Sequence, residues 1–212
     1  PNLLDREFES YGPRLVLLTD ITYIPWGGSF LYLCVIMDAY TKQVLSYTLS
    51  PSLEVDFVLD AVYLLIQEHG VSLHAETVIH SDQGCHYTSC KFIELVERND
   101  LRRSMSRRGN CWDNAPQESF FGHMKDLIDL TGDPSYDEVK AVVDDYMSYY
   151  NNERYQWDLA KLSPNEYFSF VTTGAYPLEL PNKPSTPMIL KAPHELGAFS
   201  LKQETISDSL IP

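Results

Sequence analysis

The sequence lacks a run of apolar residues long enough to cross a membrane, and its first residues do not resemble a signal peptide. It is also poor in cysteine, and its four thiols form no C-x-x-C pair. These absences argue against a membrane protein and a disulfide framework, so we expect a protein of the reduced, cytoplasmic compartment. The chain opens at Pro1 without a methionine, and we expect it to be part of a longer protein.

Basic residues are scarce, since 16 Lys and Arg stand against 30 Asp and Glu, for a net charge of −14. This balance argues against an indiscriminate nucleic-acid binder. Residues 1–97 carry 4 basic and 13 acidic side chains, whereas residues 98–125 carry 6 basic and 3 acidic ones. A charge cluster of this kind is most often a solvated face, so its meaning depends on its neighbours.

The hydrophobic pattern predicts one core of alternating strands and helices, since the chain has 212 residues and 44% apolar content. Strands are predicted at 14–24, 30–37, 43–49, 77–80 and 101–106, and helices at 53–69, 89–99, after Asn114, at 136–151 and after Ser163. The order βββαβαβα predicts an α/β fold with a mixed five-stranded sheet flanked by helices. Three strands are antiparallel and two, reached by helical crossovers, are parallel.

The same pattern suggests four segments along the chain. Residues 1–12 have no period and form an N-terminal arm, and residues 13–152 form the α/β core. Residues 153–170 form a C-terminal helical segment. From Val171 on periodicity vanishes and prolines recur, so we expect an irregular tail over 171–212.

The stretch from Ser104 to Lys125 lies within the basic island and leads into a helix. Asn114, followed three residues later by Gln117, is typical of a helix start. On that helix Glu118, Gly122 and Lys125 share one face. The other side is predicted to be core: Phe120, Phe121, Met124, Leu127 and Ile128. A carboxylate, a glycine that leaves room and a cation indicate an anionic substrate.

Two further acids stand at unusual places. Asp20 lies inside the first predicted strand, where aspartate is disfavoured, and Asp82 follows the fourth strand, where α/β sheets carry sites. If these strands are adjacent, both acids converge with Glu118. Three carboxylates without histidine or cysteine at ligand spacing predict a hard cation, Mg²⁺ or Mn²⁺. Such clusters typically hold two ions for phosphoryl transfer.

Four motifs strengthen this interpretation: TDITYI, IHSDQGCHYTS, SMSRRGNCWDNAPQESFFGHMK and YYNNERYQWDLAKLSPNEYF. Together they resemble the catalytic core of bacterial insertion-sequence transposases of the retroviral-integrase-like (DDE) superfamily, from about Asn2 to Phe170. The resemblance implies an RNase H-like fold, metal-dependent DNA cleavage and strand transfer, and a homo-oligomer on DNA. By position it makes Asp20, Asp82 and Glu118 the catalytic and metal-binding acids.

The resemblance also concerns the DNA contacts. Lys125 matches a basic residue that contacts DNA near the cleaved phosphate, and the residues expected on DNA are Arg107, Arg108, Asn110, Lys125 and Arg154. The sequence departs from the family in three ways. Leu127 stands where relatives carry an acid, the upstream helix-turn-helix segment is absent, and the tail after Phe170 matches no relative.

Two other functions stay open: an RNase H-like nuclease that cleaves without joining, and a catalytically silent DNA-binding or assembly module. Joining a freed 3′ end to a second duplex would exclude the former, and the intact acids argue against the latter. A zinc site at His80, Cys85, His86 and Cys90 has no supporting spacing.

Single residues near these motifs also allow alternatives. His86 is expected to orient the Asp82 loop, and Asp38 to serve a turn. Trp112 is either a packing anchor or a stacking partner for a base. The tyrosines between Tyr146 and Tyr155 are expected to close the core, with phosphate contact by the neighbouring Asn151, Asn152 and Arg154 as the alternative.

Overall fold

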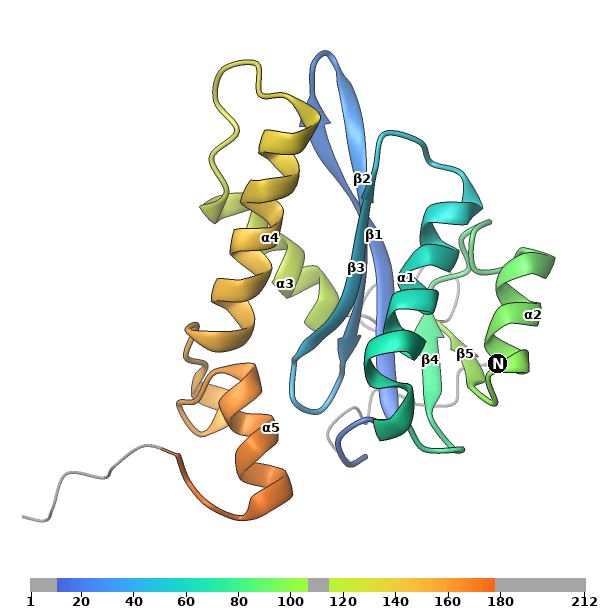
Figure 1. The fold of residues 1–212 in the computed structure, drawn as a ribbon, viewed down its shortest axis with the longest axis vertical. Helices are drawn as coiled ribbons and strands as arrows, with labels where there is room; N and C mark the ends of the chain where they lie inside the picture. Colours follow the sequence, from blue (N-terminus) through green and yellow to red (C-terminus); the bar gives the residue numbers. More distant parts are fainter. Residues whose placement is uncertain (1–10, 107–114, 178–212) are drawn as a thin grey trace, which may run out of the picture. The chain divides into compact units, whose positions relative to one another are not determined.

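Five strands form one mixed sheet in the computed structural model, which describes residues 11–106 and 115–177 (Figure 1). The strands are β1 (Val16–Trp26), β2 (Ser29–Asp38), β3 (Val44–Ser50), β4 (Val78–Ser81) and β5 (Arg102–Met105). Their order across the sheet is β3-β2-β1-β4-β5. The first three strands pair antiparallel, whereas β4 pairs parallel with both β1 and β5. The predicted mixed sheet and the adjacency of its first and fourth strands are confirmed.

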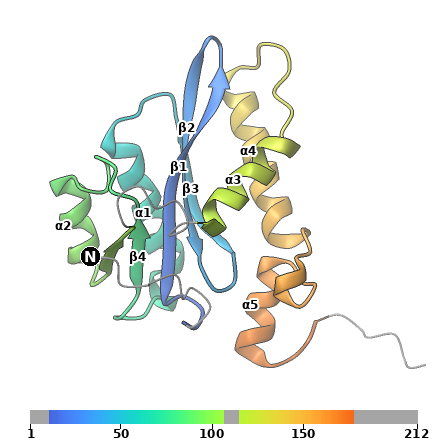
Figure 2. The same ribbon diagram turned by 180° about the vertical axis from the view of Figure 1, so that it is seen from behind.

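Helices cover both faces of this sheet. Helices α1 (Val55–His69) and α2 (Cys90–Arg98) lie on one side, and α3 (Ala115–Leu127) and α4 (Tyr136–Asn152) lie on the other, as Figures 1 and 2 show from opposite directions. Two short 3₁₀ turns, η2 (Gly70–Ser72) and η4 (Trp157–Leu159), and helix α5 (Pro164–Thr173) complete the described elements. None of the helices within 11–106 and 115–177 is long and apolar enough to cross a membrane.

Alternation along the strands divides the core into two clusters. Cys34 and Ile36 of β2 pack with α1 and α2, while Leu33, Val35 and Met37 of the same strand pack with α3 and α4. Because β2 is central and covered on both faces, it is apolar nearly throughout. Residues directly opposite on β1 and β2 point to the same face, so the register fixes which cluster each β1 side chain meets.

The β1–β2 turn is tighter than the sequence suggests. The first strand was predicted to end at residue 24, but β1 continues through Trp26 and only Gly27 and Gly28 form the turn. Both glycines have positive φ, 51° and 74°, as a two-residue hairpin turn of the primed type requires. Pro25 is tolerated because β4 pairs with β1 only as far as Leu18, so β1 is an edge strand at that level.

The helix-start predictions hold where the structure describes them. Ser135 and Glu138 form a capping box at α4, and Ser163 and Glu166 form another at α5, with Pro164 in its first turn. Helix α5 ends at Thr173, three residues beyond the expected end of the helical segment, and Gly174 (φ 74°) caps it. The rest of the predicted tail, 178–212, lies outside the described residues, as do positions 1–10 of the predicted arm.

One core prediction is wrong. Leu127 is 59% exposed, although it shares a helical face with the buried Phe120. It is the last residue of α3, where the chain leaves the helix, and Ile128 packs against the α3–α4 cluster instead. Periodicity shows which residues share a face, but not whether that face still has a neighbour at the final turn.

Candidate active site

Asp20 and Asp82 lie at matching levels of two neighbouring strands. In the parallel ladder Leu18 is opposite His80, and each acid stands two residues further along its own segment. Neighbouring strands are about 4.8 Å apart. The sequence pattern that suggested their convergence therefore agrees with the register. Asp20 is half-buried within β1, and Asp82 is exposed just beyond β4.

Tyr87, in the segment that follows Asp82, is hydrogen-bonded to β1. Its fully buried hydroxyl hydrogen-bonds to the hydroxyl of Thr19, the residue before Asp20, at 3.3 Å. The ring belongs to the segment that follows Asp82. The pKa of Tyr87 is raised well above its usual value by burial, then by Cys34 and Asp20, with Asp82 a smaller contribution. Both carboxylates therefore disfavour ionisation of the same phenol.

The backbone holds each of these carboxylates in a defined direction. Asp20 Oδ1 accepts from the N–H of Ile21 at 2.8 Å, and Asp82 Oδ1 accepts from the N–H of Gly84 at 2.8 Å. A Cβ at position 84 would stand only 2.9 Å from Asp82 Oδ1. Glycine at position 84 therefore allows the Asp82 carboxylate to approach the backbone closely; its backbone angle does not itself require glycine.

Helix α3 brings Glu118 to the Asp20 side of the sheet. Asp20 is opposite Val35 of β2, and Val35 packs with Phe120 and Phe121 of α3. The side-chain amide of Gln117 donates to the carbonyl oxygen of Val35 at 3.0 Å. The residue next to Glu118 is therefore bonded to the strand residue opposite Asp20.

The face of α3 that carries Glu118 is open. Glu118, Gly122 and Lys125 are all exposed, in agreement with their predicted common face. A Cβ at Gly122 would meet no atom within 4 Å, so the glycine leaves free space beside the carboxylate. This surface has room for a substrate between the acid and the lysine.

The donor set fits a hard divalent cation, although the side chains do not enclose one. Within 11–106 and 115–177 no three His, Cys, Asp or Glu side chains lie close enough together to hold an ion. Neither Asp82 nor Glu118 has an ion-pair partner in those ranges. Unpaired carboxylate oxygens are the ligands that Mg²⁺ and Mn²⁺ prefer.

Predicted DNA contacts fall partly outside the described residues. Arg107, Arg108 and Asn110 lie there, together with Cys111 and Trp112. Arg154 is half-buried, with its guanidinium carbon 5.8 Å from the centre of the Tyr150 ring. Tyr146 and Tyr150 are buried against Phe120 and close the core as predicted, but Tyr149 and Tyr155 are 40% and 63% exposed, so for them the prediction is wrong.

The histidines near Asp82 have structural partners. His86 Nε2 bonds to the carbonyl of Leu53 at 2.8 Å, which ties the Asp82 segment to the start of α1. His80 is fully buried, with its two ring nitrogens 2.9 and 3.1 Å from the hydroxyls of Ser104 and Ser106. Asp38 serves a turn, as predicted: its carboxylate accepts from the Thr41 hydroxyl and the Arg14 backbone.

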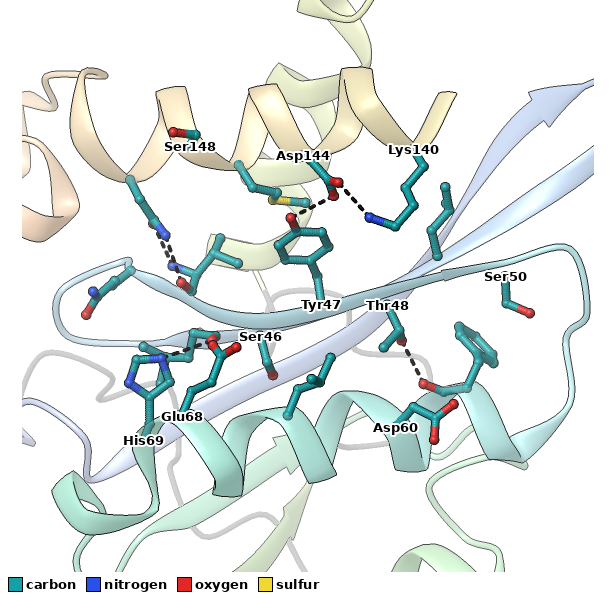
Figure 3. Close-up of a pocket in the computed structure, with 18 of the residues that line it drawn as sticks. Ser46, Tyr47, Thr48, Ser50, Asp60, Glu68, His69, Lys140, Asp144 and Ser148 are labelled. Carbon is teal, nitrogen blue, oxygen red and sulfur yellow. Dashed lines mark hydrogen bonds and ion pairs between the residues drawn. The ribbon is translucent and has the colours of Figure 1, made fainter. Parts of the chain in front are cut away.

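A pocket of about 840 Å³ lies away from these acids, along the outer edge of β3 between α1 and α4 (Figure 3). Its polar groups are largely satisfied within the protein. Asn151 both accepts from Val44 N and donates to Val44 O, while His69 and Tyr136 bond to the carbonyls of Leu45 and Leu49. The side chain of Asn151, an alternative phosphate contact, is therefore engaged with the strand. These bonds occupy backbone groups of an edge strand that would otherwise be open to another strand.

Sequence reasoning missed the roles of Gln117 and Tyr87. Gln117 was taken as part of a helix-start signature, but its amide bonds to the sheet. A signal was present, because Gln117 precedes Phe120, Phe121 and Met124 on the buried side of the helix, where a polar residue is unusual. Tyr87 had no such signal, since an aromatic in a loop is most often a packing residue.

Family models and curated proteins both show that this chain is similar to integrase cores and transposases. Integrase core domain models match residues 10–111 and 99–164. The putative transposase InsK for insertion sequence element IS150 of Escherichia coli is 35% identical over 171 residues, which is 79% of this chain and 59% of that protein. An uncharacterized transposase-like protein of Haemophilus influenzae is 32% identical over 170 residues, covering 78% of this chain and 76% of that protein.

Solved structures agree on the fold. The catalytic core domain of BIV integrase matches with a TM-score of 0.58 at 19% identity, over 76% of this chain and 98% of that one. The HTLV-2 integrase catalytic core domain in complex with magnesium matches with a TM-score of 0.53 at 14% identity, over 72% and 94%. The sheet and helices therefore form the RNase H-like fold that the sequence predicts.

Proposed function

The chain belongs to the integrase-core family of insertion-sequence transposases, and on that premise we propose that it is a catalytic domain for DNA cleavage and strand transfer. The chain spans 59% of the length of the InsK relative, so the proposal concerns the catalytic step. The observation that carries it is the matched level of Asp20 and Asp82 on parallel-paired segments, with Glu118 on the helix bonded opposite Asp20.

We propose that Asp20, Asp82 and Glu118 hold divalent metal, Mg²⁺ or Mn²⁺, at a two-ion site. When bound, such ions activate an attacking oxygen and stabilise the leaving one in phosphoryl transfer. The three residues would supply oxygen ligands from within β1, from just beyond β4 and from helix α3. An ion would also offset the repulsion that these three negative charges would have when they close around it.

The protein's remaining task is to hold the DNA backbone in line with the acids. Lys125 lies about 10.5 Å along the helix axis from Glu118, at about 1.5 Å per residue, on the same exposed face. This distance suits a phosphate contact beside the metal site rather than a place in it. Lys125, Arg107, Arg108, Asn110 and Arg154 are the side chains that we propose to bind DNA.

Substitution of the lysine tests this division of labour. Lys125→Ala should weaken productive DNA binding by about 1–3 kcal/mol, the scale of a charge-assisted hydrogen bond. Mn²⁺ binding, measured by calorimetry, should stay unchanged. A metal isotherm disturbed as strongly as that of Glu118→Gln would place Lys125 in the metal site instead.

We further propose that the domain acts as a homo-oligomer and that recognition of the element's ends depends on segments outside this chain. A net charge of −14 disfavours tight binding of DNA by the chain alone. The isolated chain should bind generic duplex weakly, and less as salt rises. Nanomolar binding that is insensitive to salt would contradict this proposal.

The decisive experiment is a strand-transfer assay with Mg²⁺ or Mn²⁺, the full-length protein and a candidate element end. Products in which a 3′ end has joined a second duplex are expected. Cleaved ends without joined products would indicate a nuclease, and absence of both in wild type would overturn the catalytic proposal.

A further inference from the structure

Gln117 is a buried amide on a helix face that is otherwise apolar. It is 0% exposed, and the buried residues that follow it on α3 are Phe120, Phe121 and Met124. Burial of an amide is unfavourable unless its polar atoms find partners. An apolar side chain of similar length would fill the same space without that cost, so the amide calls for a specific explanation.

Only one half of this amide has a partner. Nε2 donates to the carbonyl oxygen of Val35 at 3.0 Å, and the orientation follows because a carbonyl oxygen accepts and cannot donate. Oε1 is buried and has no hydrogen-bond partner among residues 11–106 and 115–177. The hydrogen bond of Nε2 stabilises the fold, but burial of the unsatisfied Oε1 destabilises it. The amide therefore contributes little net stability.

The place of the bond suggests what the amide does instead. Val35 is directly opposite Asp20 in the β1–β2 ladder, and Gln117 is the residue before Glu118. The bond therefore links the residue before one proposed metal ligand, Glu118, to the residue paired with another, Asp20. The contacts of Phe120 and Phe121 with the sheet are apolar and non-directional, so they allow small rotations or slides of α3 that a hydrogen bond resists.

We propose that Gln117 is a positioning residue that sets the separation of Glu118 from Asp20 by fixing α3 to the Val35 carbonyl. This inference rests on the proposed function, because it matters only if both acids hold metal. Gln117 itself touches neither metal nor DNA. Metal affinity depends on such orienting groups behind the ligands, whose loss typically costs about 10–100-fold.

The test compares Gln117→Met with a matched control in the same apolar cluster. Tyr146 is also buried, packs against Phe120 and has a hydroxyl without a partner, but it lies on α4. Gln117→Met and Tyr146→Phe each remove an unsatisfied polar atom from this cluster. In urea denaturation without metal, both should be as stable as wild type or more stable.

Calorimetric titration with Mn²⁺ should then separate the two variants. Gln117→Met is expected to raise the dissociation constant about 10–100-fold, whereas Tyr146→Phe leaves it unchanged. Gln117→Leu repeats the measurement with another apolar shape. An unchanged Mn²⁺ isotherm in both Gln117 variants would overturn the inference. Loss of metal-free stability in both would also overturn it, because the amide would then be a stability element.

Asp20→Asn, titrated in parallel, separates this inference from the proposed function. If Asp20→Asn loses Mn²⁺ binding while Gln117→Met keeps it, only the positioning role is wrong. If Asp20→Asn binds Mn²⁺ like wild type, the metal site itself is wrong, and the inference about Gln117 fails with it.

Discussion

The pocket beside β3, called the groove from here on, differs from the proposed metal site in whether a carboxylate has an ion-pair partner within the protein. Asp144 in the groove is 2.6 Å from the Lys140 ammonium and accepts from the Tyr47 hydroxyl at 2.8 Å (Figure 3). Asp82, in contrast, receives only a backbone N–H, and Glu118 has no ion pair in the part of the chain that the structure describes. The charge of Asp144 is balanced by a cation of the protein, whereas Asp82 and Glu118 leave negative charge for an incoming cation.

The largest expected effect comes from removing that negative charge. Asp20→Asn, Asp82→Asn and Glu118→Gln keep shape but lose the charge that holds an ion, so each should reduce cleavage by about 1,000-fold or more. Asp144→Asn is the matched control in the groove. Cleavage rates and Mn²⁺ isotherms measure the contrast.

Asp144→Asn should lose at most about 1 kcal/mol of stability and no activity, as expected for a largely exposed ion pair. Near-native turnover in any of the three acid variants would exclude that residue from the metal site. Weaker Mn²⁺ binding by Asp144→Asn would mean that the carboxylates of the groove and those of the proposed metal site do not differ in function.

The sequence alone predicts the part of this contrast that depends on the order and pairing of the strands. Asp20 and Asp82 follow neighbouring paired segments because β1 and β4 pair in parallel, and a helical crossover between two strands predicts that pairing. Glu118 follows from helical periodicity on an exposed face. These are local or topological features, so residue pattern alone could indicate them.

Side-chain partners across the fold could not be predicted in the same way. Gln117 reaches Val35 and Asn151 reaches Val44 across separations of 82 and 107 residues, and no local pattern encodes such pairs. The core prediction for Leu127 was wrong for a related reason, since the exposure of this residue depends on where α3 ends relative to its neighbours. The sequence thus predicted the strand topology around the proposed site better than the side-chain bonds that hold its elements in place.

Gly84 offers a sharper test within the site. Its φ is not in the left-handed region, so alanine is allowed by the backbone, but the new Cβ would meet Asp82 Oδ1 at 2.9 Å. The side chain of Asp82 can move away at little cost in stability. Gly84→Ala should therefore leave the fold stable and weaken Mn²⁺ binding about 10–100-fold, because the displaced carboxylate loses its direction.

Gly70→Ala is the control for this substitution. Its added Cβ would meet Ile66 at 3.6 Å, an ordinary contact, and Gly70 follows the end of α1, where it lines a separate hollow with Leu73 and Leu101. Urea denaturation and the Mn²⁺ isotherm of both variants decide the outcome. A wild-type isotherm for Gly84→Ala would show that the direction of the Asp82 carboxylate is not important for metal binding.

In the groove, substitutions should change stability and leave chemistry intact. Asn151→Ala removes two hydrogen bonds, of 2.9 and 2.8 Å, to the backbone of Val44, and should lower the free energy of unfolding by about 1–3 kcal/mol. Cleavage per folded molecule should equal that of wild type. Asn152→Ala, which removes an exposed amide one residue away, should have a smaller effect on urea denaturation. Equal effects would mean that capping of the β3 edge contributes nothing.

The smallest expected effect is a pH dependence that belongs to the groove. The pKa of His69 is lowered, first by burial and then by the positive charge of Arg14, although its bond to Leu45 O and the charge of Glu68 act in the opposite direction. With a folded pKa below the unfolded value of about 6.5, the unfolded state binds more protons between the two. His69 therefore stabilises the fold fully above the unfolded pKa, and this contribution is lost as pH falls below it. Urea denaturation at pH 7.5 and 5.5 should show a loss of stability in wild type that is reduced in His69→Gln. An identical loss in both would assign the pH dependence to other groups and leave His69 as a neutral cap on β3.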